Sequence, residues 1–318
     1  MKVLTHSLFQ EVINNFETMK DKEGNKLDMF SLIISQGDCC FSHYFKKDID
    51  LIDIRSISKA FLCVSLGIGI DEGISIDGEK LTLETKMWSF FKNKVNLSNE
   101  KNKANLEKIK LKHLLSHSMG FEKGLMFSKD IEHINPECFL DYIFNTNIVY
   151  EPGTKHIYSN VGPYLISVLI QNEFGINFSQ WAYEKLLSKL EINNYEWKNY
   201  GKYCAGCTGL ELSHKDLHKL GGLFMNDGMY KNSKIVSKNW LDSMRSIQIL
   251  TPDKYDLSRV LPKYGYGLSM VICDNGIYYC DGSGGQYLIM NPHNTIVISI
   301  LANQSDNKPI TEALRPII

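Results

Sequence analysis

Residues 56–70 read SISKAFLCVSLGIGI, and this stretch decides the fold. Over residues 60–70, apolar side chains occupy nearly every side of a helix, which is typical of a helix buried in the centre of a protein. Asp71-Glu72-Gly73 then ends the helix. Ser56 and Lys59 stand at its start, three residues apart, and therefore share one helical face. We expect a hydroxyl and an amine side by side at the N-terminus of a central helix.

Ser56 supplies a hydroxyl that can act as a nucleophile, and Lys59 supplies an amine that can activate it without a histidine. Burial lowers the pKa of a lysine, and the resulting neutral amine accepts the proton of a nearby hydroxyl. Ser-x-x-Lys also occurs at Ser89–Lys92, Ser98–Lys101 and Ser305–Lys308, but only the first copy opens a buried apolar helix. The alternative is that Lys59 only caps the helix or extends to solvent. We predict acyl-transfer chemistry with Ser56 as nucleophile and Lys59 as its proton partner.

The composition is that of an ordinary protein with a large core. The 318 residues suffice for one large domain or two interleaved ones, and the net charge of −1 predicts neither a nucleic-acid nor a membrane partner. The N-terminus lacks the apolar segment and cleavage site of a secretory leader, which predicts a cytoplasmic protein. The eight cysteines are then predicted to be free thiols. A thiol redox or metal role for Cys204, Cys207 and Cys280 is a weaker alternative, because no βαβ pattern or second ligand pair accompanies them.

Strand-like segments at both ends of the chain indicate one sheet. Residues 29–35 and 39–45 have the pattern of a hairpin that follows an amphipathic helix. Near the C-terminus, β-like runs occur at 264–272, 277–280, 286–290 and 295–301. We predict an α+β fold, in which an antiparallel sheet from both chain ends is flanked by helices and carries an inserted, mostly helical domain. The predicted sheet domain is discontinuous (1–75 and 205–318), the helical domain spans 76–204, and the active site lies between them.

A second group of candidates, Tyr158-Ser159-Asn160, follows the helix-breaking residues Glu151-Pro152-Gly153. A tyrosine beside a lysine cation has a lowered pKa, because the cation favours the phenolate. Tyr158 then serves as general base toward a serine hydroxyl and as general acid toward the leaving group. Asn160 has a donor and an acceptor for hydrogen bonds to substrate and to Lys59. Taken alone, Tyr158 fits a packed or surface tyrosine better, and only its combination with the upstream serine and lysine favours catalysis.

Near the C-terminus, Asp281-Gly282-Ser283 begins a glycine-rich stretch that ends at Gly284-Gly285-Gln286. Glycines there let a substrate approach closely along the edge of a strand. We predict that Asp281, Gly282 and Ser283 bind substrate. A backbone N–H of this segment, together with that of Ser56, is expected to form an oxyanion hole. The alternative is a plain glycine-rich hairpin turn.

These segments, in this order, resemble the serine β-lactamase and penicillin-binding-protein superfamily, in particular its class C-type, esterase and nylon-oligomer-hydrolase branch. Residues 112–120, KHLLSHSMG, are similar to RHLLTHTSG of that family. Residues 151–160, EPGTKHIYSN, are similar to its PGxxxxYSN, and Gly284-Gly285-Gln286 before Pro292 is similar to its GGQ…P ending. The resemblance covers most of the chain and implies a β-lactamase-like fold. It also implies that the upstream serine is the nucleophile, that the lysine is its proton partner, and that Tyr158 is the second-motif tyrosine.

The third motif departs from this resemblance. Relatives carry Lys-Thr-Gly there, and the cation holds the substrate carboxylate. The aligned residues here are Cys280-Asp281-Gly282, so the cation is missing and an acidic residue stands in the motif. Asp281 is expected to repel a carboxylate and to favour an amine or amide group. We therefore expect neither classical penicillin hydrolysis nor cell-wall transpeptidation, which also requires secretion.

His113 and His117 lie one helical turn apart on a helix predicted to stop at Met119-Gly120, which is the spacing of a zinc-binding pair. The glutamate of HExxH is absent, and the resemblance implies a structural role instead. We predict that the protein holds no metal and no cofactor.

The combined motifs predict a serine hydrolase that cleaves a small ester or amide through an acyl-enzyme on Ser56. A D-amino-acid peptidase or amidase is one alternative on the same fold. A non-catalytic ligand-binding or sensor protein is another, because the third motif is degraded. The substrate and the oligomeric state are left open by the sequence.

Overall fold

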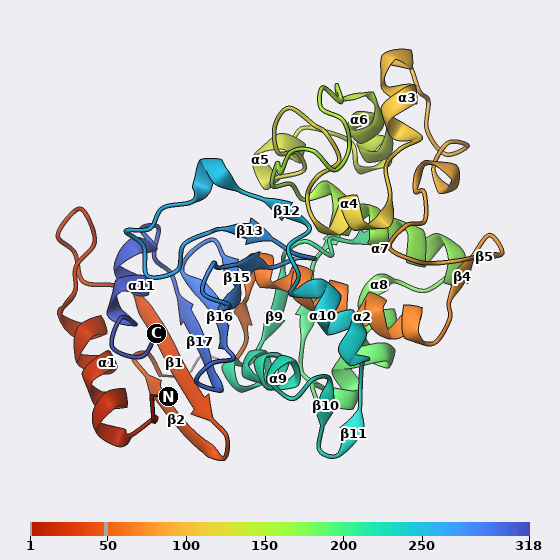
Figure 1. Ribbon diagram of the computed structural model, residues 1–318. Helices are drawn as coiled ribbons and strands as arrows, with labels where there is room; N and C mark the ends of the chain where they lie inside the picture. The colour runs from red at the N-terminus through yellow and green to blue at the C-terminus, as the bar shows by residue number, and fades with distance from the viewer. Residues whose placement is uncertain (1, 48–49) are drawn as a thin grey trace.

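An antiparallel sheet built from both ends of the chain is the framework of the molecule (Figure 1). It belongs to a computed structural model that describes residues 2–47 and 50–318. In spatial order its eight strands are β12 (Ile249–Leu250), β13 (Gly265–Tyr266), β14 (Val271–Ile272), β15 (Tyr278–Gly282), β16 (Gln286–Asn291), β17 (Ile296–Ala302), β1 (Met29–Gln36) and β2 (Cys39–Tyr44). The two chain ends meet where β1 pairs with β17, with Ile34 opposite Ile298. The predicted α+β fold is thereby confirmed.

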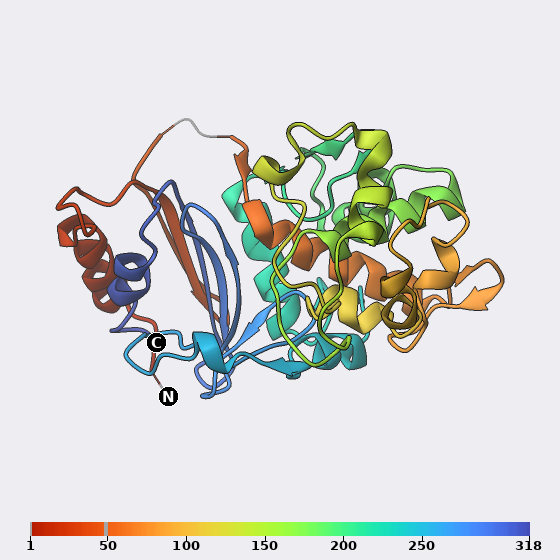
Figure 2. The same cartoon turned by 90° about the horizontal axis from the view of Figure 1, so that it is seen from above.

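Helices cover both faces of this sheet, as the view from above shows (Figure 2). On one face lie α1 (His6–Thr18) and α11 (Lys308–Ala313), and on the other lie α2 (Ser58–Asp71) and α9 (His214–Met225). Side chains of successive strand residues point to opposite faces. The apolar side chains of β16 and β17 accordingly divide between two hydrophobic clusters, one on each side of the sheet. The central strands are therefore buried on both faces.

Helix α2 is the central helix that its sequence predicts, since every residue from Ser58 to Gly69 is buried. A Cβ atom on Gly67 would lie 2.1 Å from the ring of Trp240, so only glycine lets α10 (Lys238–Met244) pack this closely. The indole Nε1 of Trp240 also donates a hydrogen bond to the carbonyl of Cys63 at 3.0 Å. This bond ties α10 to the middle of α2.

Helices, all but α7 of them short, and irregular segments make up most of the described residues 76–204, and they lie beside the sheet (Figure 1). These helices are α3 (Lys103–Leu106), α4 (Leu111–Leu115), α5 (Ser128–Ile131), α6 (Phe139–Asn145), α7 (Val161–Phe174) and α8 (Phe178–Ala182). Small antiparallel pairings join β3 (Ile52–Asp53) and β6 (Glu196–Trp197) to β9 (Leu210–Leu212), β4 (Ser75–Ile76) to β5 (Glu79–Lys80), β7 (Asn199–Tyr200) to β8 (Tyr203–Cys204), and β10 (Met229–Tyr230) to β11 (Ser233–Lys234). One hydrophobic cluster continues from the sheet through α2 into α7, and the boundaries drawn between two domains stay a prediction. Among the described residues, no helix combines the length and the apolar character that a membrane crossing requires.

Two local predictions are wrong. Residues 264–272 form a hairpin of β13 and β14 rather than one strand, because the N–H of Gly267 donates to the carbonyl of Met270 at 2.9 Å and closes a turn. The helix predicted to run to Met119 ends at Leu115, since His117 has a left-handed backbone with φ of 54°. In the first of these places, Leu268 and Met270 continue the apolar pattern through the turn, so the pattern alone does not mark it.

A buried hydrogen-bond network joins α9 to the sheet. The hydroxyl of Ser299 lies 2.8 Å from His214 Nε2 and 2.9 Å from His218 Nδ1. The other ring nitrogens reach Ser31 Oγ at 2.5 Å and Ser35 Oγ at 2.8 Å. Burial lowers the pKa of His214 to about 3 and that of His218 to about 4. Both imidazoles are therefore neutral at pH 7, and each is satisfied by hydroxyl groups.

The network predicts that stability falls in mild acid. A histidine whose pKa is lower in the folded state binds its proton in the unfolded chain first, so stability is lost as pH falls from about 6.5 toward about 4, with a slope of up to ~1.4 kcal/mol per pH unit for each histidine. Urea midpoints of the wild type measured at pH 7.5 and 5.5 should show this loss, and His218→Gln should reduce it. His133→Gln, at an exposed position, is the control. An undiminished loss in His218→Gln would contradict this account.

Candidate active site

Ser56 lies in a short 3-10 helix, Arg55–Ile57, that leads directly into α2. The preceding Arg55 has a left-handed backbone with φ of 54°, a conformation that costs a non-glycine residue about 1–2 kcal/mol. Asp53 supports it twice, because its carboxylate accepts the Arg55 backbone N–H at 2.7 Å and pairs with the guanidinium at 2.9 Å. The turn that presents the serine is therefore strained and braced by the strand before it.

Lys59 lies beneath Ser56 and is 1% exposed. Its Nζ donates to Ser56 Oγ at 3.2 Å and to the carbonyl of Cys207 at 2.8 Å. No motif predicted a role for this carbonyl, which comes from the Cys204–Cys207 segment. Burial raises the pKa of both thiols, that of Cys204 to about 12, so they stay protonated. The contribution of this segment to the site is a backbone oxygen rather than a reactive thiol.

Tyr158 and Asn160 enter the site on a segment that is fixed by its backbone. The N–H of Ile157 donates to the carbonyl of His117 at 2.9 Å, and the N–H of Asn160 donates to the carbonyl of Leu125 at 3.0 Å. The ring centroid of Tyr158 lies 4.9 Å from Lys59 Nζ, which gives the lysine and the tyrosine a direct contact. The two predicted partners of the serine thus meet at one place.

The predicted hydrogen bond between Asn160 and Lys59 does not form. The amide nitrogen of Asn160 donates to the carbonyl of Met126 at 3.1 Å. Its Oδ1 is buried and has no hydrogen-bond partner among the described residues. Because an unsatisfied buried acceptor is costly, this oxygen is a fitting receptor for a substrate N–H or a water molecule.

The third predicted segment closes the site from the sheet side. Strand β15 ends beside the turn of Ser56, where a Cβ atom on Gly282 would lie 2.9 Å from the Cβ of Arg55 and 2.9 Å from the carbonyl oxygen of Ile54. Glycine is therefore required for the strand to approach the serine turn. Asp281, Gly282 and Ser283 line the same pocket as Ser56.

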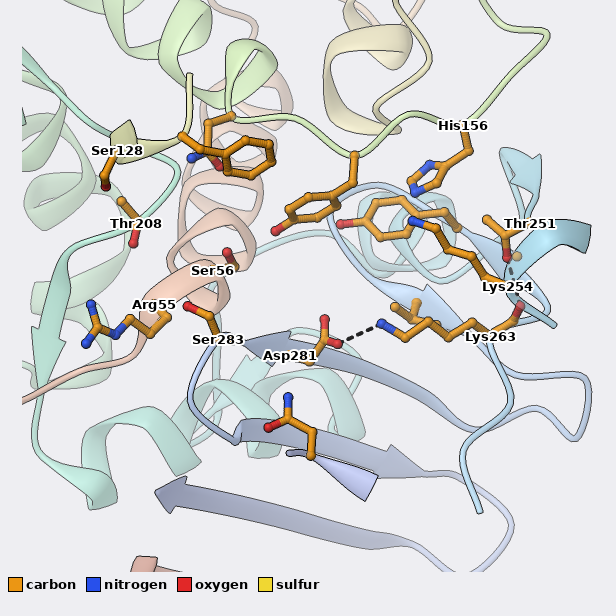
Figure 3. Close-up of a pocket in the computed structure, with 18 of the residues that line it drawn as sticks. Arg55, Ser56, Ser128, His156, Thr208, Thr251, Lys254, Lys263, Asp281 and Ser283 are labelled. Carbon is orange, nitrogen blue, oxygen red and sulfur yellow. Dashed lines mark hydrogen bonds and ion pairs between the residues drawn. The ribbon is translucent and has the colours of Figure 1, made fainter. Parts of the chain in front are cut away.

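These segments enclose a pocket of about 500 Å³ (Figure 3). Six of the seven residues predicted for the site line it, and the seventh, Lys59, lies buried below the serine. That volume fits a small-molecule substrate. The structure therefore brings all the sequence-predicted candidates together, although their chemical roles stay predictions.

The charges of the pocket differ from those predicted. The carboxylate of Asp281 is paired with Lys263 Nζ at 2.8 Å, and Lys254 also lines the pocket (Figure 3). Cys280, which aligns with the expected lysine, is buried and directs its Sγ to the carbonyl of Ser269 at 3.8 Å. The prediction of a site without a cation at this wall is wrong, because two lysines arrive from the loop between β12 and β13. No motif surrounds them that would have revealed this.

Neutral aromatic side chains form the wall behind Tyr158. The His117 ring centroid lies 4.5 Å from that of Tyr158 and 5.1 Å from that of Tyr266. Burial, and then the charge of Lys59, hold the pKa of His117 well below its usual value. Burial also lowers the pKa of His156 to about 4, while its Nδ1 contacts the carbonyl of Ser116 at 3.1 Å. This wall therefore adds no positive charge to the pocket at neutral pH.

A sheet from both chain ends, a helix-opening serine above a buried lysine, and a tyrosine from the helical region define a protein of β-lactamase fold. The model of the beta-lactamase family matches residues 50–317, and the chain belongs to this family. Members of the family are hydrolases. The resemblance to the β-lactamase and penicillin-binding-protein superfamily is thereby confirmed.

Solved structures share this fold at low sequence identity. EstCE1, a hydrolase with promiscuous acyltransferase activity, superposes with a TM-score of 0.74 and 14% identity over 97% of this chain and 98% of its own. A penicillin-binding protein from Bacillus halodurans gives a TM-score of 0.70 and 14% identity, with 98% and 100% covered. A protein proposed to be a 6-aminohexanoate-dimer hydrolase, from Bacillus anthracis, gives 0.71 and 16%, with 90% and 76% covered. At such identities the likeness concerns the fold.

The close approach at Gly282 predicts a steric effect on the site. Gly282→Ala should destabilise the protein by about 1–3 kcal/mol and displace the serine turn, because the new methyl group meets the Cβ of Arg55 and the carbonyl oxygen of Ile54. Urea unfolding measures this change. Gly222→Ala, in α9 with nothing within 4 Å of the added methyl, is the matched control and should be neutral or stabilising. Equal stability of the two variants would show that the packing at Gly282 is loose.

Proposed function

We propose that this protein is a hydrolase that cleaves a small ester or amide through an acyl-enzyme on Ser56. The observation that carries the proposal is the 3.2 Å contact between Lys59 Nζ and Ser56 Oγ. Lys59 is buried and has no carboxylate partner among the described residues. A buried amine without a counter-ion is costly to keep, and a role in moving the serine proton explains its presence.

The proposed reaction has two halves. In the first, the proton of Ser56 Oγ passes to the Lys59–Tyr158 pair while the oxygen attacks the substrate carbonyl carbon. Backbone N–H groups of the serine turn and of the Gly282–Ser283 strand end stabilise the oxyanion. The pair then returns a proton to the leaving alcohol or amine, and the acyl group stays on the serine. In the second half, water attacks the acyl-enzyme, and its proton follows the same route.

The choice of ester or amide follows from the fold relatives and from the pocket. EstCE1 is a hydrolase with acyltransferase activity, and the relative from Bacillus anthracis is proposed to act on 6-aminohexanoate dimer. The free Oδ1 of Asn160 suits the N–H of an amide substrate. We extend the proposal to a cytoplasmic enzyme that acts on small molecules without nucleic acid, membrane, metal or cofactor.

A serine-directed probe tests the nucleophile. A fluorophosphonate should add its phosphonyl mass to the wild type, and Ser56→Ala should abolish the addition while its circular dichroism stays that of the wild type. Ser89→Ala, which removes the exposed serine of another Ser-x-x-Lys, should still be labelled. Stable labelling of a protein that turns over no activated ester would favour the alternative of a binding or sensor protein. Labelling that persists in Ser56→Ala would refute the proposed nucleophile.

The proposed role of Lys59 predicts opposite effects on activity and stability. Lys59→Met should lower ester turnover by about 10²–10⁴-fold, because the proton acceptor is lost. Its melting temperature should be equal to or higher than that of the wild type, since a buried polar amine without a counter-ion is replaced by an apolar side chain of similar length. Calorimetry and ester hydrolysis measure the two effects. A large fall in melting temperature would instead indicate that the lysine holds the fold together.

A further inference from the structure

The charged side chains of the pocket are arranged unevenly around Ser56. Four charged residues line it, namely Arg55, Lys254, Lys263 and Asp281. Figure 3 shows Lys254 and Lys263 extending from one wall toward the middle of the pocket, while Arg55 lies at the opposite end. The two ends of a bound substrate therefore meet different charges.

Two of the three cations already have a counter-ion. Arg55 is paired with Asp53 at 2.9 Å, and Lys263 is paired with Asp281 at 2.8 Å. Lys254 has no ion pair and no side-chain hydrogen bond in the part of the chain that the structure describes. Lys254 is thus the lysine without a direct ion pair at the wall that it shares with Lys263, although the charges of Asp253 and Asp281 act on it from a longer distance.

Two features of the pocket disfavour the charged form of Lys254. Although the side chain as a whole is exposed, desolvation in the pocket and then the neighbouring Lys263 lower its pKa. His156, on the same side, is neutral and supplies no negative charge. An anion bound between the two lysines relieves both the desolvation and the repulsion.

We propose that the substrate of this site carries a carboxylate, which Lys254 binds at the wall opposite Arg55, and that the Lys263–Asp281 pair sets the strength of this preference. The proposal deepens the proposed function and rests on it. Arg55 is a poorer receptor, because its guanidinium is already engaged by Asp53. The carboxylate preference reverses the expectation from the sequence, in which Asp281 stood unpaired and favoured an amine.

The net charge of this wall predicts whether each substitution strengthens or weakens the preference for a carboxylate. With Lys254, Lys263 and Asp281 in place, the wall carries a net charge of +1. Lys254→Met and Lys263→Met each reduce it to zero, and Asp281→Asn raises it to +2 because Lys263 loses its partner. A substrate with a carboxylate should bind more tightly as the net charge of the wall rises from zero to +2. The binding of a neutral substrate should change much less.

Matched esters measure the preference during turnover. The pairs are 4-nitrophenyl monoadipate with its methyl ester, and 3-acetoxybenzoate with its methyl ester, so that the carboxylate lies on the acyl part or on the leaving part. In at least one of the two pairs, kcat/KM for the anionic ester should exceed kcat/KM for the neutral ester. Lys254→Met should lower the ratio of the anionic to the neutral value by about tenfold or more, and Asp281→Asn should raise it. Lys234→Met, in the exposed β11, should leave the ratio unchanged.

Binding to a protein without the nucleophile separates this proposal from the proposed function. Ser56→Ala protein is titrated with 3-acetoxybenzoate and with its methyl ester, and NMR chemical shifts give the two dissociation constants. The anion should bind more tightly, and Ser56→Ala/Lys254→Met should lose the difference. Equal binding of anion and ester, or a preference that survives Lys254→Met, would overturn the carboxylate site even if the enzyme is active. Anion binding without turnover by the wild type would uphold the site and count against the hydrolase.

Discussion

The site depends on the two hydrogen bonds that hold the buried side-chain amine of Lys59. The amine donates one to the hydroxyl of Ser56 and the other to the carbonyl of Cys207. Removing a lysine amine from water without a counter-ion costs several kcal/mol, and two hydrogen bonds and one aromatic face offset only part of this cost. The remainder has to come from the packing of α2, which is buried along nearly its whole length. The buried helix α2 therefore carries a lysine whose burial is costly. A role in moving protons within the pocket explains why a lysine stands there.

Three segments far apart in the sequence have to meet around this amine, and each is fixed by a different device. The serine turn is braced by Asp53 against the left-handed backbone of Arg55. The tyrosine segment is held by backbone hydrogen bonds to the loop that follows α4. Strand β15 approaches the serine turn because Gly282 has no side chain. Of the three segments, β15 is part of the sheet whose strands come from both chain ends, whereas the serine turn follows β3 of a separate three-stranded sheet.

Much of this arrangement is predictable from the sequence, because it depends on local patterns. The buried helix is visible in its apolar residues, and the motifs around Ser56, Tyr158 and Gly282 are specific when they occur in order. The turn within 264–272 was not predictable, since apolar residues run through it. The carbonyl of Cys207 and the two pocket lysines, Lys254 and Lys263, were not predictable either. Any residue type has a carbonyl, and a lysine in a polar loop looks the same whether it faces solvent or substrate.

The central claim is that an acyl group passes through Ser56, and rapid quenching with intact-mass analysis tests it most directly. Wild-type protein is mixed with 4-nitrophenyl esters of several acids and quenched in acid within the first turnover. Its intact mass is measured by mass spectrometry, and the protein is then digested for peptide mapping. The account predicts a mass increase equal to the acyl group of each ester, located on the peptide that contains Ser56. Hydrolysis of these esters with no adduct at any time, or with the adduct on another residue, would contradict it.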